Sequence, residues 1–135
     1  MTTIVTRAGK GSPLTNAEVD ANFTNLDANK LELIVTEIAS ASTITPPSEN
    51  TQYNVTALAV AATIAAPSGS PTAGKKLILR LEDNGTARVL TWNAIYRAIG
   101  VTLPSTTMLG KTMYIGMSYN GTDTKWDVIA INVEV

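Results

Sequence analysis

The side chains that most often perform catalysis and bind metals are missing from this sequence. Its 135 residues include no histidine and no cysteine. A thiol nucleophile, a disulfide framework, a zinc knuckle and a Ser-His-Asp triad are therefore excluded for this chain acting alone. The residue types that remain for chemistry are carboxylates, one glycine-rich basic segment and a few aromatic side chains.

The carboxylates and the basic segment have no spacing that indicates catalysis. Asp83 and Asp123 stand beside Asn-Gly pairs, where aspartate favours a turn, so neither a glycosidase pair nor a metal site is indicated. Residues 9–12, with the sequence GKGS, lack the upstream glycine of a phosphate-binding loop and the Ser or Thr directly after its lysine. We therefore predict a protein without enzymatic activity, cofactor or metal ion.

The composition favours assembly over binding to nucleic acid or membrane. Ten basic and eleven acidic residues give a formal net charge of −1, whereas nucleic-acid binding requires a basic surface. Only 16% of the residues are charged, which suggests that copies of the chain cover one another's surface. The apolar stretch from Leu58 to Pro67 is too short to span a bilayer, and the first residues lack the apolar core of a secretory signal. We expect synthesis in the cytoplasm and no nucleic-acid or membrane partner.

Charge and composition divide the chain into three segments. Residues 1–14 carry Arg7 and Lys10, two glycines and a proline but no acid, which predicts an extended anchoring arm. Residues 15–40 are acidic and predict a helical trimerisation or stalk segment. Residues 41–135 have nearly balanced charge and predict a β-sandwich knob.

The sequence marks the start of the helix better than its end. Thr15 and Glu18 have the spacing of a capping box, in which each side chain bonds to the backbone of the other residue. The helical pattern is regular to about Lys30. The apolar spacing then changes, and we expect the helix to extend to Ala39.

Three apolar residues form a stripe on this predicted helix. Val19, Phe23 and Leu26 follow one another at spacings of four and three residues, which places them on one face. Two interpretations follow: the stripe lies against the chain's own β-domain, or it meets identical helices in a short bundle. Two heptads are marginal as an isolated coiled coil, so a bundle needs support from the β-domains.

From Thr43 onward, apolar and polar residues alternate as they do in half-buried strands. Asn84-Gly85 and Asn120-Gly121 predict hairpin turns. Six to eight short strands separated by such turn residues predict a mainly β fold, an antiparallel sandwich of the jelly-roll kind. The two predicted hairpins join residues 77–82 to 89–92 and residues 112–119 to 125–133.

The last predicted strand is apolar on both faces. Strict alternation places one set of apolar side chains on one face and a second set on the other. The strand is then either central and covered on both sides, or one of its faces meets a neighbouring subunit. The first set is Trp126, Val128 and Ala130, and the second is Ile129, Ile131 and Val133.

The aromatic residues of the β-domain allow two interpretations. Trp92 and Tyr96 either contribute to the core or a subunit interface, or stack on the sugar rings of a glycan at the surface. The nearby Arg97 is a candidate for an ion pair across a subunit boundary.

Two parts of the chain resemble proteins of tailed bacteriophages. Residues 6–26, from TRAGKGSPLTNAEVD to ANFTNL, closely resemble the recurrent N-terminal segment of tail fibres and related virion proteins. Residues 58–67, 76–80 and 90–93 are similar to a β-module of phage structural proteins. The resemblance implies a trimer with an N-terminal anchoring segment and a distal β-rich knob, and it implies no catalytic residue.

The length of the chain favours one of the roles that this resemblance leaves open. Fibres of the family continue for hundreds of residues, so 135 residues suit a compact knob on a shell better than a long fibre. The leading hypothesis is a homotrimeric capsid decoration (cement) protein on the phage particle surface, made in the host cytoplasm. Its partners are itself and the major capsid protein or other virion subunits, which Arg7 and Lys10 of the arm help to bind. The expected trimer-interface residues are Val19, Phe23, Leu26, Leu33, Ile129, Ile131 and Val133.

The alternative hypothesis is a short tail fibre that recognises its host. In this case the protein is a receptor-binding module, and Trp92 and Tyr96 contact a glycan of the host surface. A glycan array or a host-cell pull-down separates the two hypotheses.

Overall fold

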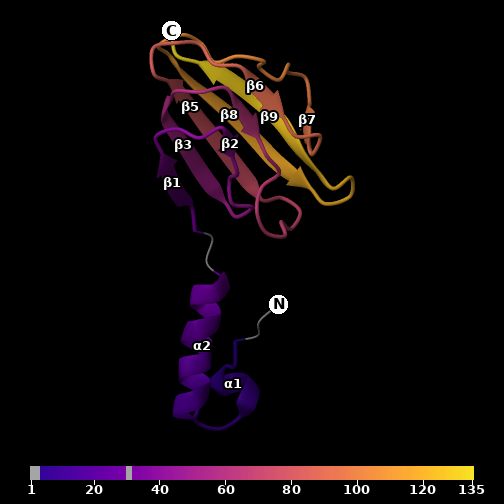
Figure 1. Ribbon diagram of the computed structural model, residues 1–135. Helices are drawn as coiled ribbons and strands as arrows, with labels where there is room; N and C mark the ends of the chain where they lie inside the picture. The colour runs from indigo at the N-terminus through magenta and orange to yellow at the C-terminus, as the bar shows by residue number, and fades with distance from the viewer. Residues whose placement is uncertain (1–3, 30–31) are drawn as a thin grey trace. The chain divides into compact units, whose positions relative to one another are not determined.

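A computed structural model describes residues 4–29 and 32–135, which divide into an N-terminal helical unit that ends at Glu32 and a β unit that begins at Leu33 (Figure 1). The prediction of a mainly β fold is confirmed. The two helices are α1 (Arg7–Lys10) and α2 (Asn16–Asn29). The strands are β1 (Ile34–Ile38), β2 (Thr43–Ile44), β3 (Thr51–Leu58), β4 (Ala62–Ile64), β5 (Lys76–Asp83), β6 (Leu90–Trp92), β7 (Tyr96–Ala98), β8 (Thr112–Asn120) and β9 (Lys125–Val133).

Local capping explains both helices. The Thr6 side chain accepts a hydrogen bond from the Gly9 amide at 3.1 Å, and Gly11 ends α1 with a φ of 71° in the left-handed region that favours glycine. The segment that we predicted to be an extended arm therefore contains a helical turn. At the start of α2, the predicted capping box of Thr15 and Glu18 is confirmed.

The expected continuation of the helix to Ala39 is wrong. Residues 34–38 form strand β1, which pairs in parallel with β3 from Ile34 opposite Thr51 to Ile38 opposite Val55. The run Ile-Val-Thr at residues 34–36 is β-branched, and such side chains favour a strand over a helix. The predicted end of the regular helix at Lys30 lies outside the described residues.

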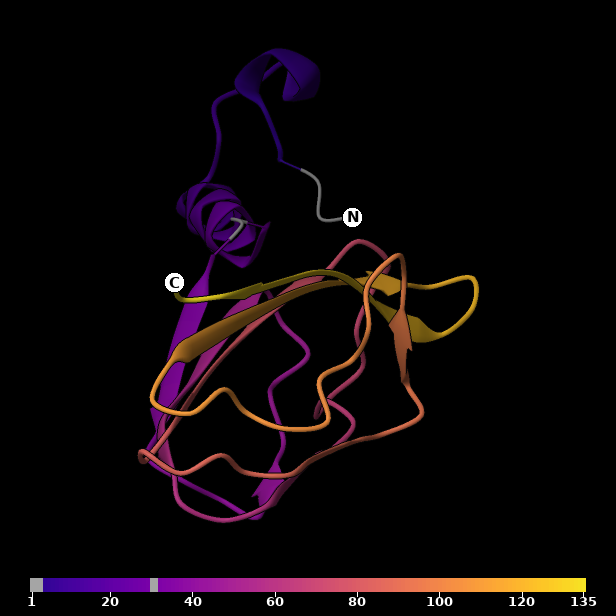
Figure 2. The ribbon, with the colours of Figure 1, turned by 90° about the horizontal axis from the view of Figure 1, so that it is seen from above.

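The β unit is built by a chain that winds between two sheets. β1, β3 and β5 are parallel neighbours in the larger sheet, and β2, β4 and β6 are parallel neighbours in the smaller one. Each of three successive turns thus adds one strand to each sheet (Figures 1 and 2). β8, β9 and β7 complete the larger sheet, whose order is β1-β3-β5-β8-β9-β7.

This winding differs from the antiparallel sandwich that we predicted. Among the paired strands of the described residues, only β5 with β8 and β8 with β9 are antiparallel. The predicted hairpin of residues 112–119 and 125–133 is confirmed as β8 and β9, with Asn120 opposite Lys125 across the turn. The hairpin predicted at Asn84-Gly85 is wrong, because β5 pairs with β3 and β8 while β6 pairs with β4 in the other sheet.

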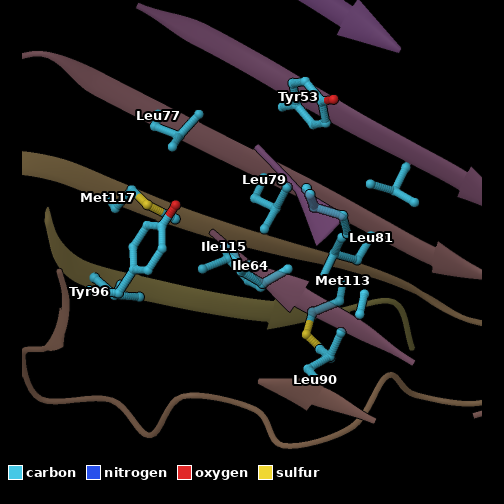
Figure 3. Packing of buried hydrophobic residues seen from close by; sticks show 14 of the residues in the cluster. Tyr53, Ile64, Leu77, Leu79, Leu81, Leu90, Tyr96, Met113, Ile115 and Met117 are labelled. Carbon is cyan, nitrogen blue, oxygen red and sulfur yellow. The ribbon is translucent and has the colours of Figure 1, made fainter. Parts of the chain in front are cut away.

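The core lies between the two sheets. Alternate residues of β5 and β8 point inward, so that Leu79 and Ile115 of the larger sheet face Ile64 of the smaller one (Figure 3). All three side chains are fully buried. Burial of these faces is the main stabilising contribution to the β unit.

A β-bulge accounts for the apolar character of both faces of β9. The register between β8 and β9 shifts between Gly116 and Met117, because Met117 pairs with Val128 while Gly116 pairs with Ala130. Ile129 is the extra residue, and the strand changes phase there. Ile131 and Val133 therefore pack against the same core as Val128, and only Ile129 of the expected second set is strongly exposed, at 53%.

The bulge predicts different effects for two identical substitutions in one strand. We expect Ile131→Ala to lower the free energy of unfolding by about 2 kcal/mol, because its side chain packs on the core. Ile129→Ala should change it by less than about 0.5 kcal/mol, because that side chain is exposed. Urea unfolding of the two variants measures both values, and equal losses would contradict the assigned bulge.

Candidate functional site

The described helical unit presents an apolar stripe that it does not cover itself. Phe23 and Leu26 are 67% and 57% exposed, and Val19 is half-buried. The spacing of these residues along α2 places them on one face, as predicted. Large exposed apolar side chains that share a face are typical of a binding surface.

The N-terminal arm is folded back onto α2 rather than extended. The side-chain amide of Asn22 pairs with the backbone of Val5 twice, accepting from its N–H and donating to its C=O, both at 2.8 Å. Lys10 forms an ion pair with Glu18 at 2.5 Å. These contacts are polar and exposed, so the arm is held by hydrogen bonds and charge rather than by a core.

Glu18 connects the arm to the start of α2. One of its oxygens accepts from the Lys10 ammonium, from the Thr15 amide at 2.7 Å and from the Thr15 hydroxyl at 3.0 Å. The Lys10 ammonium and then the Thr15 amide lower the pKa of Glu18 to about 2. Of the two arm residues expected to bind a partner, Lys10 thus bonds within the chain, while Arg7 lies exposed in α1.

The remaining residues expected at a trimer interface differ in how far they are exposed. Leu33 precedes β1 and is 57% exposed, and Ile129 is exposed at the bulge. Ile131 and Val133 are partly buried against the core of their own domain. The bulge turns these two residues toward the core of their own domain, which favours the interpretation that this part of the strand is covered within the domain.

The two aromatic residues expected to contact a glycan are engaged within the domain. Tyr96 is 5% exposed, its hydroxyl donates to the Ala65 carbonyl at 2.8 Å, and burial raises its pKa. Trp92 is half-buried, donates its indole N–H to the Pro104 carbonyl at 2.8 Å and packs edge-to-face on Tyr96 with ring centroids 5.3 Å apart. The buried position of Tyr96 contradicts the expectation that it stacks on a sugar and supports the core interpretation.

Arg97, the candidate for an ion pair across a subunit boundary, forms ion pairs within its own chain. Its guanidinium donates twice to Asp127, at 2.7 and 3.0 Å, and once to Asp123 at 2.8 Å. The Arg97 guanidinium lowers the pKa of Asp127, aided by a hydrogen bond from Asn120. This network joins β7 to β9 and to the loop between β8 and β9, and it is structural.

Asp83 holds a more central position than the sequence indicated. It is 4% exposed at the end of β5, and its carboxylate accepts from the Thr107 hydroxyl at 2.8 Å and from the amides of Gly85 and Gly110 at 3.0 Å. Burial raises the pKa of Asp83, but these donors outweigh it and keep the pKa below its ordinary value. The sequence indicated only that Asp83 stands beside an Asn-Gly pair, and its partners at residues 107 and 110 are distant in the chain and carried no signal.

A hollow with a volume of about 360 Å³ lies on the outer face of the larger sheet, next to β8. Arg80 lines it but already donates to Glu82 at 2.8 Å and to Thr112 at 3.3 Å, so its charge is compensated. The other lining residues are Thr112, Tyr114, Asn132, Val133 and Glu134.

No group of side chains suited to hold a metal ion occurs among residues 4–29 and 32–135. Neither helix in the described part of the chain is long and apolar enough to cross a membrane. Comparisons with known protein families, with curated proteins and with solved structures found no match. The candidate functional surface is therefore defined by the geometry of α2 and its arm.

Acid is expected to break the contact between Lys10 of the arm and Glu18 at the start of α2. The pKa of Glu18 is lowered from 4.5 to about 2, so its ion pair contributes stability above pH 4.5 and loses it as the pH falls toward 2. The protection of the Thr15 and Glu18 amides against hydrogen exchange, measured by NMR relative to the intrinsic exchange rate at each pH, should fall over this range. Glu18→Gln should remove the pH dependence, and a Glu18 titration midpoint near 4.5 would contradict the assigned contacts.

Proposed function

We propose that this protein is a structural protein of a tailed-bacteriophage virion that acts as a homotrimer. Its finer role is capsid decoration: the helical unit anchors the protein, and the β unit forms a knob that reinforces the shell. The observation that carries this proposal is the exposed pair Phe23 and Leu26 within the segment that resembles phage virion proteins. Both side chains lose water contact when identical helices associate.

The length of the helix supports a knob close to its anchoring surface. α2 has 14 residues, which span about 21 Å at 1.5 Å per residue. The arm before it presents Arg7. Lys10 is paired with Glu18, so it binds an acidic group of a partner only if that group displaces the Glu18 carboxylate. Anchoring in this proposal combines apolar burial on α2 with charged contacts from the arm.

The β unit supports a structural role more than glycan recognition. Its Trp92 and Tyr96 donate hydrogen bonds to the domain's own backbone, and Tyr96 is buried. A receptor-binding role therefore lacks the exposed aromatic pair on which it depended.

Two substitutions on α2 should weaken self-association. Phe23→Ala and Leu26→Ala each remove exposed apolar area from the proposed interface, and we expect dissociation to become at least about tenfold more favourable for each. Sedimentation equilibrium measures the change. Ala21→Gln, on the opposite and exposed side of α2, should leave association unchanged.

Two results would oppose the proposal at different points. A wild-type chain that sediments as a monomer at micromolar concentration would contradict self-association without the capsid. Gold-labelled antibodies on phage particles distinguish the locations, because label on the shell supports decoration and label confined to the tail contradicts it.

A further inference from the structure

The loop after β5 contains one of two Asn-Gly pairs in the sequence, Asn84-Gly85 and Asn120-Gly121. Asparagine is chemically labile before glycine, because the backbone nitrogen of the glycine can attack the side-chain carbonyl carbon. Glycine has no Cβ to hinder that approach. Asn84 and Gly85 are both exposed, and Gly85 has a φ of 84°.

A carboxylate is in contact with the attacking group of this pair. The Gly85 amide, which is the nucleophile in such a reaction, donates to Asp83 Oδ1 at 3.0 Å. Asp83 is buried and is fixed from two further sides by Thr107 and Gly110. It is therefore a positioned proton acceptor for the Gly85 N–H.

A cation is in contact with the group that is attacked. Arg88 donates from Nη2 to Asn84 Oδ1 at 2.9 Å. This hydrogen bond polarises the side-chain carbonyl and places positive charge where the oxygen becomes negative during attack. The base and the charge stabiliser of an intramolecular addition thus flank the same dipeptide.

The second Asn-Gly pair has different surroundings. The Asn120 oxygen accepts from the amides of Thr122 and Asp123, and its side-chain nitrogen donates to Asp123 and Asp127. These contacts fix the amide group in the turn, and no cation is among its hydrogen-bond partners in the described part of the chain. Asn120 is therefore an internal control with the same dipeptide.

We propose that Asn84-Gly85 is a self-modification site at which Asp83 and Arg88 promote cyclisation and loss of ammonia. The Gly85 nitrogen forms a bond to Cγ of Asn84 and gives its proton to Asp83. The bond from Cγ to Nδ2 then breaks, and the leaving nitrogen departs as ammonia with the proton that Asp83 returns. Water opens the resulting succinimide at either carbonyl, which yields aspartate or isoaspartate at position 84.

The modification changes the charge of the loop. One neutral amide becomes a carboxylate, so the formal net charge of the chain becomes one unit more negative than −1. The new carboxylate lies next to Arg88, which already contacts position 84. The reaction depends on the β unit alone and is independent of the proposed virion role.

The test follows both Asn-Gly pairs in the same full-length molecule. The folded chain is incubated at neutral pH, and peptide mass spectrometry quantifies aspartate plus isoaspartate at positions 84 and 120. A parallel sample unfolded in urea gives the unassisted rate at each position. We expect Asn84 to convert faster in the folded chain than in the unfolded chain, and Asn120 to convert more slowly when folded.

Two variants separate assistance from loop flexibility. Arg88→Met removes the cation but keeps an apolar side chain of similar length, and it should slow conversion of Asn84 at least about tenfold. Lys76→Met is the matched control: it removes a cation at the opposite end of β5 that donates to Ser118 and contacts none of the reacting groups, and it should leave that rate within about threefold of wild type. Circular dichroism confirms that both variants are folded. Conversion of folded Asn84 at or below the unfolded rate, or an Arg88→Met variant as fast as wild type, would overturn the proposal.

Discussion

The burial of apolar side chains between two sheets is the constraint on which the β unit depends. Successive turns supply inward-facing residues to both sheets, and fully buried residues such as Ile64 and Leu79 come from strands of different turns. The three turns contribute β1, β3 and β5 to the larger sheet. β8 and β9 then extend the same apolar face beyond β5. The bulge at Ile129 contributes to this burial, because it lets the end of β9 cover the core.

The elements that were predicted correctly depend on neighbours in the sequence. The capping box of Thr15 and Glu18, the hairpin at Asn120-Gly121 and the alternation of β5 all arise from local residue types. The parallel winding could not be predicted in this way. Ile34 pairs with Thr51 and Thr51 pairs with Leu77, so successive turns differ in length and leave no repeat in the sequence. The bulge was missed for a related reason: strict alternation assumes a constant phase, and a single extra residue reverses it.

The candidate interface was predicted in part. The spacing of Val19, Phe23 and Leu26 correctly placed them on one face of a helix, because that face follows from helical periodicity alone. The fold-back of the arm was not foreseen, since it depends on side-chain pairing between Asn22 and Val5, far apart in sequence. The described helical unit thus joins its arm to α2 by polar contacts and leaves Phe23 and Leu26 exposed, which is the arrangement expected of a segment completed by association.

The two Asn-Gly pairs show how surroundings decide what a dipeptide does. At Asn120 the side chain makes its hydrogen bonds to the turn and to two carboxylates, so the amide serves the geometry of the hairpin. At Asn84 the chain leaves the larger sheet for the smaller one, and the same dipeptide sits between a buried carboxylate and a guanidinium. Asp83 is held there by hydrogen bonds from the Thr107 hydroxyl and the Gly110 amide, which belong to a loop distant in the sequence. The reactive arrangement at Asn84 is therefore a consequence of the winding, and an antiparallel hairpin at this position would not have created it.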